Sequence, residues 1–136
     1  SLKFLPKSIR KKAKKDTNIG LIYFGSTSVA VDEANDILED QGYAVDLLRI
    51  RSFPFGRGIS TFIDDHDHVI VMEQNRDAQM RSLLINELDK NGSKIHSILN
   101  FDGSPVTADF IVKSFLSLLK KNQFNIKSLK KKKSAA

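Results

Sequence analysis

The sequence contains no cysteine among its 136 residues. Without thiolates, the chain cannot form a disulfide bond, ligate an iron–sulfur cluster or build a cysteine-ligated zinc site. This absence fits a cytoplasmic location, where structural disulfides are rare. No apolar run approaches the ~20 residues that a membrane-spanning helix needs, and the first residues lack the apolar core of a signal peptide. We therefore expect a cytoplasmic protein that has no membrane partner.

Acidic residues are nearly absent from both ends of the chain. Residues 1–16 hold seven basic residues and one Asp, and residues 113–136 hold eight Lys and no acid. Residues 17–112 hold seven basic and 15 acidic residues, so the net charge of +6 belongs to the ends. Nucleic-acid-binding folds carry positive charge on their packed surface, so we expect no nucleic-acid partner. The alternative, a binder with basic arms, predicts salt-dependent binding that vanishes when both ends are trimmed.

Short apolar runs alternate along the chain with segments of helical periodicity. Strands are expected over 19–24, 45–50, 69–72 and 95–101, and helices over 28–41, 59–65, 78–90 and 107–121. Ser28 and Thr107 are placed as N-caps, and Gly42 is expected in a left-handed conformation after the first helix. Buried strands that alternate with helices predict an α/β domain with a parallel sheet covered on both faces. We place this domain at residues 19–121 and expect a disordered basic tail at 122–136.

A dense group of polar residues follows the run 69–72 without a break. Open α/β sheets place their working residues at the carboxyl end of a central strand, which is where this group would lie. No nucleophile or tuned acid–base pair accompanies it, so we interpret it as a contact surface for another subunit. Asn75 or Asp77 is placed to cap the next helix, and Glu73 to pair with Arg76 or with a partner chain. The expected surface comprises Glu73, Gln74, Asn75, Arg76, Asp77 and Gln79, with Arg49 and Arg51 behind them.

Gly25 and Ser26 lie between the first strand and its helix, where backbone N–H groups and hydroxyls can hold a phosphate. The later glycines of a dinucleotide-binding motif and the Lys of a P-loop are missing, so a plain tight turn is the competing interpretation. If the strands 19–24 and 69–72 are neighbours, Gly25 and Ser26 face Glu73, Gln74 and Asn75 across one crevice.

Two further groups of charged residues have a structural alternative. Arg49 and Arg51 alternate along the second strand, so they either clamp a carboxylate or phosphate or form salt bridges to the acidic body. Residues 64–68 combine carboxylates with imidazoles, but neighbours in sequence rarely converge on one metal ion. We therefore expect no metal site in this chain.

Four stretches, taken in order and spacing, resemble one known family. They are IYFGST with AVDEA at 22–27 and 30–34, DLLRIRSFPF at 46–55, VMEQNRDAQ at 71–79 and NFDGSPVT at 100–107. They are similar to the C-terminal domain of the alpha subunit of 2-oxoacid:ferredoxin oxidoreductases, the 2-oxoglutarate type especially. The polar stretch after the buried strand is the most specific, and the lysine tail departs from the family. Because FLP at 4–6 looks like that family's connector, residues 1–18 are expected to join a preceding domain.

The resemblance implies a transketolase C-terminal-like fold: a three-layer α/β/α sandwich with a mostly parallel sheet, often with one antiparallel strand. It implies a parent enzyme that converts a 2-oxo acid, CoA and oxidised ferredoxin into acyl-CoA, CO2 and reduced ferredoxin on thiamine diphosphate. Thiamine diphosphate, Mg and the iron–sulfur clusters would lie in other domains, so we expect no cofactor and no catalytic residue on this chain. The expected partners are the preceding alpha-subunit domain and the beta subunit. Ferredoxin and CoA would be met through other domains, and a homodimer is a further option.

The chain alone is therefore expected to be inactive and to support subunit assembly and the cofactor site of a parent enzyme. Two other interpretations stay open. A free-standing α/β module would bind a small anion or nucleotide through Gly25, Ser26 and Arg49, which calorimetry would detect. The equivalent domain of a transketolase or of a 2-oxoacid dehydrogenase beta chain would lack the Gln-Asn-Arg-Asp run.

Overall fold

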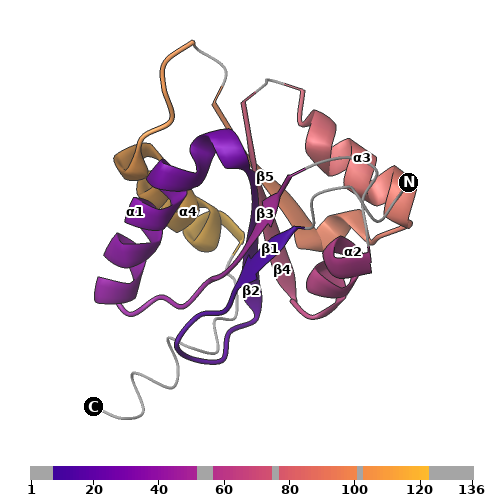
Figure 1. Ribbon diagram of the computed structural model, residues 1–136, viewed down its shortest axis with the longest axis horizontal. Helices are drawn as coiled ribbons and strands as arrows, with labels where there is room; N and C mark the ends of the chain where they lie inside the picture. The colour runs from indigo at the N-terminus through magenta and orange to yellow at the C-terminus, as the bar shows by residue number, and fades with distance from the viewer. Residues whose placement is uncertain (1–7, 52–56, 75–76, 101–102, 123–136) are drawn as a thin grey trace.

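Five strands form one sheet in the order β1-β3-β2-β4-β5 (Figure 1). The computed structural model describes residues 8–51, 57–74, 77–100 and 103–122. Neighbouring strands are parallel except at one edge, where β1 runs antiparallel to β3. The strands are β1 (Ile9–Lys11), β2 (Ile19–Phe24), β3 (Asp46–Ile50), β4 (His68–Glu73) and β5 (Ile95–Leu99).

Two pairs of helices cover the two faces of this sheet. In Figure 1, α1 and α4 lie to the left of the sheet, and α2 and α3 lie to its right. The predicted three-layer α/β/α sandwich with a mostly parallel sheet is thereby confirmed. The helices are α1 (Ser28–Asp40), α2 (Arg57–Asp64), α3 (Gln79–Leu88) and α4 (Ala108–Asn122), with two 3-10 turns, η2 (Gly25–Thr27) and η3 (Gly92–Lys94).

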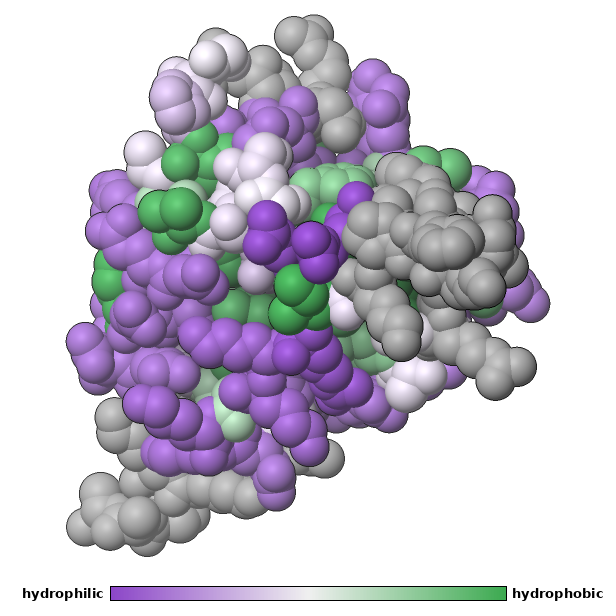
Figure 2. All heavy atoms as spheres, in the orientation of Figure 1, coloured by the Kyte–Doolittle hydropathy of each residue, from purple (hydrophilic) through white to green (hydrophobic). Residues whose placement is uncertain are grey.

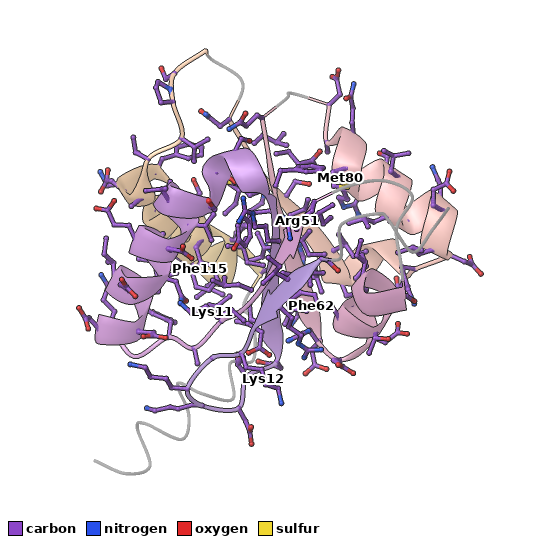
Figure 3. The ribbon with its side chains drawn as sticks, in the orientation of Figure 1. Lys11, Lys12, Arg51, Phe62, Met80 and Phe115 are labelled. Carbon is purple, nitrogen blue, oxygen red and sulfur yellow. The ribbon has the colours of Figure 1, made fainter. Side chains whose placement is uncertain are left out.

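The side chains of β2 alternate between the two faces of the sheet, and both faces are buried. Leu21 and Tyr23 belong to the core under α1 and α4, which includes Phe115. Ile22 belongs to the core under α2 and α3, which includes Phe62. Figure 3 shows Phe115 and Phe62 on opposite sides of the sheet. A strand buried on both faces reads as an unbroken apolar run, which is why the sequence predicts β2 and β4 well.

The edge strand β1 lies inside the segment expected to be a connector, and its sequence does not predict it. Its three residues are exposed, so no apolar pattern marks it. It is held by an antiparallel ladder to β3, in which Ile9 pairs with Arg49. Arg10 adds side-chain contacts, because Nη1 lies 3.0 Å from an Asp65 carboxylate oxygen and the guanidinium 5.2 Å from the Phe62 ring centroid. Residues 9–11 therefore belong to the sheet.

At α1 and α4, two predicted helix ends are confirmed and one is wrong. Gly42 follows α1 with a φ of 94°, and the hydroxyl of Thr107 accepts a hydrogen bond from the Phe110 N–H at 3.1 Å at the start of α4. Ser28 is not the N-cap of α1 but its first residue, because the turn η2 precedes it. Thr27 takes the cap position and makes no side-chain bond to the helix.

Candidate functional site

The order of the strands reverses between β2 and β4. The chain leaves β2 through α1 to reach β3 on one side, and then crosses through α2 to β4 on the other side. The strands 19–24 and 69–72 are therefore neighbours, which is the condition that the expected crevice required. In parallel sheets, such a reversal opens a crevice at the carboxyl ends of the two strands.

A hollow of about 580 Å³ lies at this reversal. One side consists of η2 and the first turns of α1, another of Gln74 after β4, and the third of the start of α4. Ser26 and Gln74 come together as the sequence predicts, whereas Gly25 is not part of the lining and Asn75 lies outside the described residues. The lining comprises Ser26, Thr27, Val29, Ala30, Glu33, Gln74, Pro105, Val106, Thr107, Ala108 and Asp109.

The described lining of this hollow carries hydroxyls, one amide and two carboxylates, but no Lys, Arg or His. Glu33 and Asp109 repel anions, so the charge of the lining disfavours a phosphate at this place. Activating a hydroxyl as a nucleophile would need an adjacent base such as His. The chemistry of these side chains instead suits hydrogen bonds to polar protein groups. Hydrophilic residues also dominate the described surface on the face drawn in Figure 2, where apolar ones form small separate patches.

Glu73 ends β4 and is the buried anchor of the loop that follows. Its residue is 2% exposed, and its carboxylate accepts hydrogen bonds from the backbone N–H of Met80 at 2.6 Å and of Arg81 at 3.4 Å. The Ser97 hydroxyl on β5 donates to the same carboxylate at 3.0 Å. A carboxylate at a helix N-terminus is stabilised by the unpaired N–H groups and the helix dipole. Glu73 therefore lies behind the expected contact surface and not in it.

The capping of α3 differs from the prediction. The N-cap is Ala78, which has a left-handed backbone with φ 50° and no side-chain bond to the helix. Asp77 therefore does not hold the cap position, and Asn75 lies outside the described residues together with Arg76. The carboxylate that caps the helix comes from Glu73, because the loop folds back over the end of β4. Gln74, Asp77 and Gln79 are the exposed residues of the described part of this loop.

Arg49 lies beneath the turn that follows β2. A Cβ on Gly25 would be 2.7 Å from Arg49 Nη2, so the guanidinium packs directly against the glycine backbone. Arg49 Nε is buried and has no hydrogen-bond partner among the described residues. Burial raises the pKa of the nearby Tyr23 hydroxyl, the charge of Asp32 adds to this, and the charge of Arg49 opposes it. Arg49 thus supports the turn, while Arg51, at the end of the described segment after β3, is exposed.

The residues 64–68 diverge to separate partners. Asp64 receives a hydrogen bond from Lys90 Nζ at 2.8 Å, and Asp67 receives one from Asn18 Nδ2 at 3.0 Å. His66 is 2% exposed, with Nε2 2.7 Å from the Asp46 carboxylate. Among the described residues, no group of three His, Cys, Asp or Glu is arranged to hold a metal ion. The Asp46–His66 pair joins residues 20 apart, so sequence spacing carries no signal for it.

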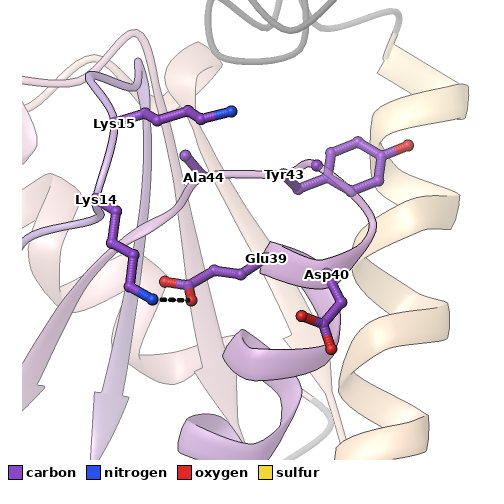
Figure 4. Close-up of a pocket in the computed structure, with 7 residues that line it drawn as sticks. Lys14, Lys15, Glu39, Asp40, Tyr43 and Ala44 are labelled. Carbon is purple, nitrogen blue, oxygen red and sulfur yellow. Dashed lines mark ion pairs between the residues drawn. The ribbon is translucent and has the colours of Figure 1, made fainter.

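A smaller pocket of about 190 Å³ lies at the other end of the sheet (Figure 4). Lys14 and Glu39 form an ion pair of 3.8 Å across it, and Tyr43 forms one wall. Lys15 and Asp40 add one further charge of each sign. Because its charges cancel, this pocket selects neither an anion nor a cation.

In the part of the chain that the structure describes, no helix is long and apolar enough to span a membrane.

The three layers, the antiparallel edge strand and the crevice at the strand reversal define the class of transketolase-like α/β domains. Three solved structures share this fold. 2-Oxoglutarate:ferredoxin oxidoreductase from Magnetococcus marinus, solved with 2-oxoglutarate, coenzyme A and succinyl-CoA bound, matches 85% of this chain with a TM-score of 0.73 and 24% identity. The alpha chain of a probable 2-oxoacid ferredoxin oxidoreductase from Thermoplasma acidophilum matches 84% with a TM-score of 0.55 and 23% identity. A split gene transketolase, described as an inactive beta4 tetramer, matches 84% with a TM-score of 0.65 and 17% identity.

The matched regions differ in their share of each relative. The chain spans 20% of the Magnetococcus chain, 97% of the Thermoplasma chain and 41% of the transketolase chain. No protein-family model matches the chain, and no curated protein matches its sequence. At these identities the likeness establishes the transketolase-like fold.

Proposed function

We propose that this chain is a non-catalytic domain of the alpha subunit of a thiamine-diphosphate-dependent 2-oxoacid:ferredoxin oxidoreductase. The observation that carries the proposal is the fold likeness to two such oxidoreductases, joined to the four sequence stretches that resemble the same family in register. The parent enzyme would oxidise a 2-oxo acid with CoA and ferredoxin. This chain would brace the subunits around the reacting centre and would be inactive alone.

The proposed contact surface is the loop after β4. Its base is rigid, because the buried carboxylate of Glu73 binds the start of α3 and the side chain of Ser97. Its tip is polar and exposed at Gln74, Asp77 and Gln79. A rigid base with polar groups at the tip suits recognition of another chain, since little conformational freedom is lost on binding. Asn75 and Arg76 belong to the same proposed surface in the sequence, and Arg51 extends it.

The described residues do not fit a diphosphate group. The hollow at the strand reversal carries Glu33 and Asp109 and no cationic side chain in its described lining. Arg49, the nearest candidate, packs against Gly25 beneath the turn. The proposal therefore assigns thiamine diphosphate, Mg and the iron–sulfur clusters to other domains of the parent enzyme. No step of the reaction is assigned to side chains of this chain.

The test is assembly with the remaining subunits of the parent enzyme. Asp77→Lys reverses a charge on the proposed surface, and we expect at least a tenfold loss in co-purification of the beta subunit. Asp36→Lys makes the same charge change at an exposed position of α1, away from the loop, and serves as the matched control. Equal assembly of both variants and the unchanged protein would remove the loop from the interface.

The transketolase neighbour has the same fold, so fold alone does not separate the two parent enzymes. Activity of the reconstituted complex separates them. Our proposal expects CoA-dependent reduction of ferredoxin with a 2-oxo acid, whereas a transketolase would transfer a two-carbon unit between sugar phosphates. Ketol transfer without electron transfer would refute the proposal.

A further inference from the structure

The strand β5 forms the outer edge of the sheet. At one end of this edge the outward backbone groups are hydrogen-bonded within the chain (the closed end), and further along they remain available to another strand (the open end). The backbone N–H of Asn100 donates to the Glu73 carbonyl at 2.8 Å, so Asn100 faces β4. Because residues of a strand alternate in the direction of their backbone groups, Ile98 also faces β4, and Ser97 and Leu99 face outward. This alternation decides which backbone groups another strand could reach.

The closed end is at Ile95. Its N–H donates to the Gly92 carbonyl within η3, and its carbonyl accepts a hydrogen bond from Arg81 Nε at 2.6 Å. Arg81 Nη2 also donates to the Gly92 carbonyl at 2.7 Å. Along the described strand, the outward backbone groups left for a partner are therefore those of Ser97 and Leu99.

β5 carries none of the residues that usually protect an exposed edge. Native sheets guard such edges with Lys, Pro, bulges or very short strands, but β5 reads IHSIL over five residues. The opposite edge of the same sheet is the contrast. There the strand β1 has three residues and carries Arg10 and Lys11. One edge is thus guarded and the other is suited to pairing.

A groove of about 330 Å³ runs beside the open edge. Its floor is formed by Ser97, Ile98 and Leu99, and its wall by the outward face of α4. The wall residues are Lys113, Ser114, Ser117 and Leu118. The two serines are small, so a second helix can approach α4 closely along this face.

We propose that β5 and α4 form the contact surface for a second copy of this chain, related by a twofold axis at Ile98. With that axis, Ser97 of one copy lies opposite Leu99 of the other, and both carry outward backbone groups. The pairing is antiparallel and makes four interchain backbone hydrogen bonds. Ile95 and the Arg81 side chain that closes it stay outside the paired stretch.

The helices support the same axis through charge complementarity. α4 has Asp109 in its first turn, where it pairs with Lys113 of the same helix at 3.0 Å, and Lys120 and Lys121 in its last turn. A twofold axis at Ile98 sets α4 of the two copies antiparallel, so Asp109 at the start of each helix lies near the two lysines at the end of the other. Neighbouring strands lie about 4.8 Å apart, and helices pack at about 8–10 Å. Two helices that each lie over β5 and its inner neighbour therefore meet at packing distance, with Ser114 and Ser117 between them.

The first experiment is sedimentation of the full 136-residue chain over a range of concentrations. We expect a dimer, and we expect Ser117→Glu to weaken it at least tenfold by placing two carboxylates at the axis. Thr61→Glu, at an exposed position of α2 on the other face, is the matched control and should leave the dimer intact. Circular dichroism of each variant reports whether the fold is kept. A monomer at all concentrations overturns the proposal, as does a dimer that is equally stable in both variants.

The second experiment uses the absence of cysteine from the chain. Ser117→Cys should give a cross-linked dimer with a short bismaleimide, and Thr61→Cys should not. Charge exchange tests the helix register: Lys121→Asp and Asp109→Lys should each weaken the dimer, and the double variant should restore it. Cross-linking only to a different protein in a mixture, or failure of the double variant to restore association, overturns the twofold pairing. These readouts are independent of any parent enzyme, so the proposed function can fail while this proposal stands.

Discussion

A single buried carboxylate supports the loop at the carboxyl end of β4. Glu73 accepts hydrogen bonds from the N-terminus of α3 and from Ser97 on β5. Leaving buried donors unpaired costs about 1–3 kcal/mol each, so we expect Glu73→Ala to lower the free energy of unfolding by at least ~2 kcal/mol. Ser97→Ala removes one donor and should cost about 1 kcal/mol. Urea unfolding followed by circular dichroism measures both, and an unchanged midpoint for Glu73→Ala would contradict this role.

The histidines His68 and His96 give the stability a pH dependence. Burial lowers the pKa of both, because it disfavours the charged imidazolium. Well above the ordinary value of 6.5 both histidines are neutral in the folded and in the unfolded chain, so their titration gives the stability no pH dependence there. As the pH falls below it, the unfolded chain binds protons first, so the free energy of unfolding decreases.

The measurement is urea unfolding of the protein and of the double variant His68→Gln, His96→Gln between about pH 5.5 and 8, each normalised to its own value at the upper end. We expect the double variant to show a flatter dependence over the lower half of this range. Identical slopes would show that these two side chains do not carry the effect.

At the scale of elements, β2 and α2 approach each other at a glycine. A Cβ on Gly20 would lie 2.5 Å from Phe62 Cε1 and 3.2 Å from His66 Nδ1. Phe62 is fully buried and cannot move aside, so we expect Gly20→Ala to destabilise the protein by about 1–3 kcal/mol through overpacking.

Gly58→Ala is the matched control for this prediction, because Gly58 lies on the exposed side of α2. The same substitution there should stabilise the helix by up to about 1 kcal/mol, since Ala is the better helix former. Among the described residues, its added Cβ would meet the Ser8 hydroxyl, at 3.3 Å. Opposite signs for the two glycines would confirm that close packing of β2 against α2 decides the effect. A neutral Gly20→Ala would mean that α2 can shift away from the sheet.

At the scale of the whole molecule, charge is divided between an acidic middle and basic ends. Removing residues 123–136 deletes five Lys and no acid, so we expect non-specific binding to DNA at low salt to fall by at least tenfold. Because the sequence predicts a disordered tail, the free energy of unfolding of the shortened chain should stay within about 0.5 kcal/mol. Filter binding at two salt concentrations and urea unfolding measure the two effects. Undiminished DNA binding would place the basic surface that binds DNA on the folded body.

The sequence predicts those elements whose burial shows in the pattern of their own apolar residues. β2 and β4 are unbroken apolar runs, and the switch to helical spacing marks α1 and α4. β1 escapes prediction because its stability comes from pairing with β3, which leaves no trace in its own three residues. The strand β5 is predictable from its own residues. Its position at an open edge is not, because that depends on how the strands assemble into the sheet.

The candidate site is predictable in position but not in the roles of its residues. The rule for strand reversal brings Ser26 and Gln74 together as expected. Glu73 reads as a surface residue because it opens a polar run, yet its partner Met80 lies seven residues on, a spacing that matches no helical or capping pattern. The role of Arg49 under Gly25 likewise depends on two strands meeting, which only the fold supplies.

Glu73 also links the opening motions of two segments of the molecule. Its side chain accepts a hydrogen bond from the amide of Met80, and its carbonyl accepts one from the amide of Asn100. The start of α3 and the strand β5, which the Arg81–Ile95 hydrogen bond also joins, therefore share one support. Such a shared support makes them part of one cooperative unit. In native-state hydrogen exchange, the protons of these two amides should therefore be released in the same opening event, with matching protection factors.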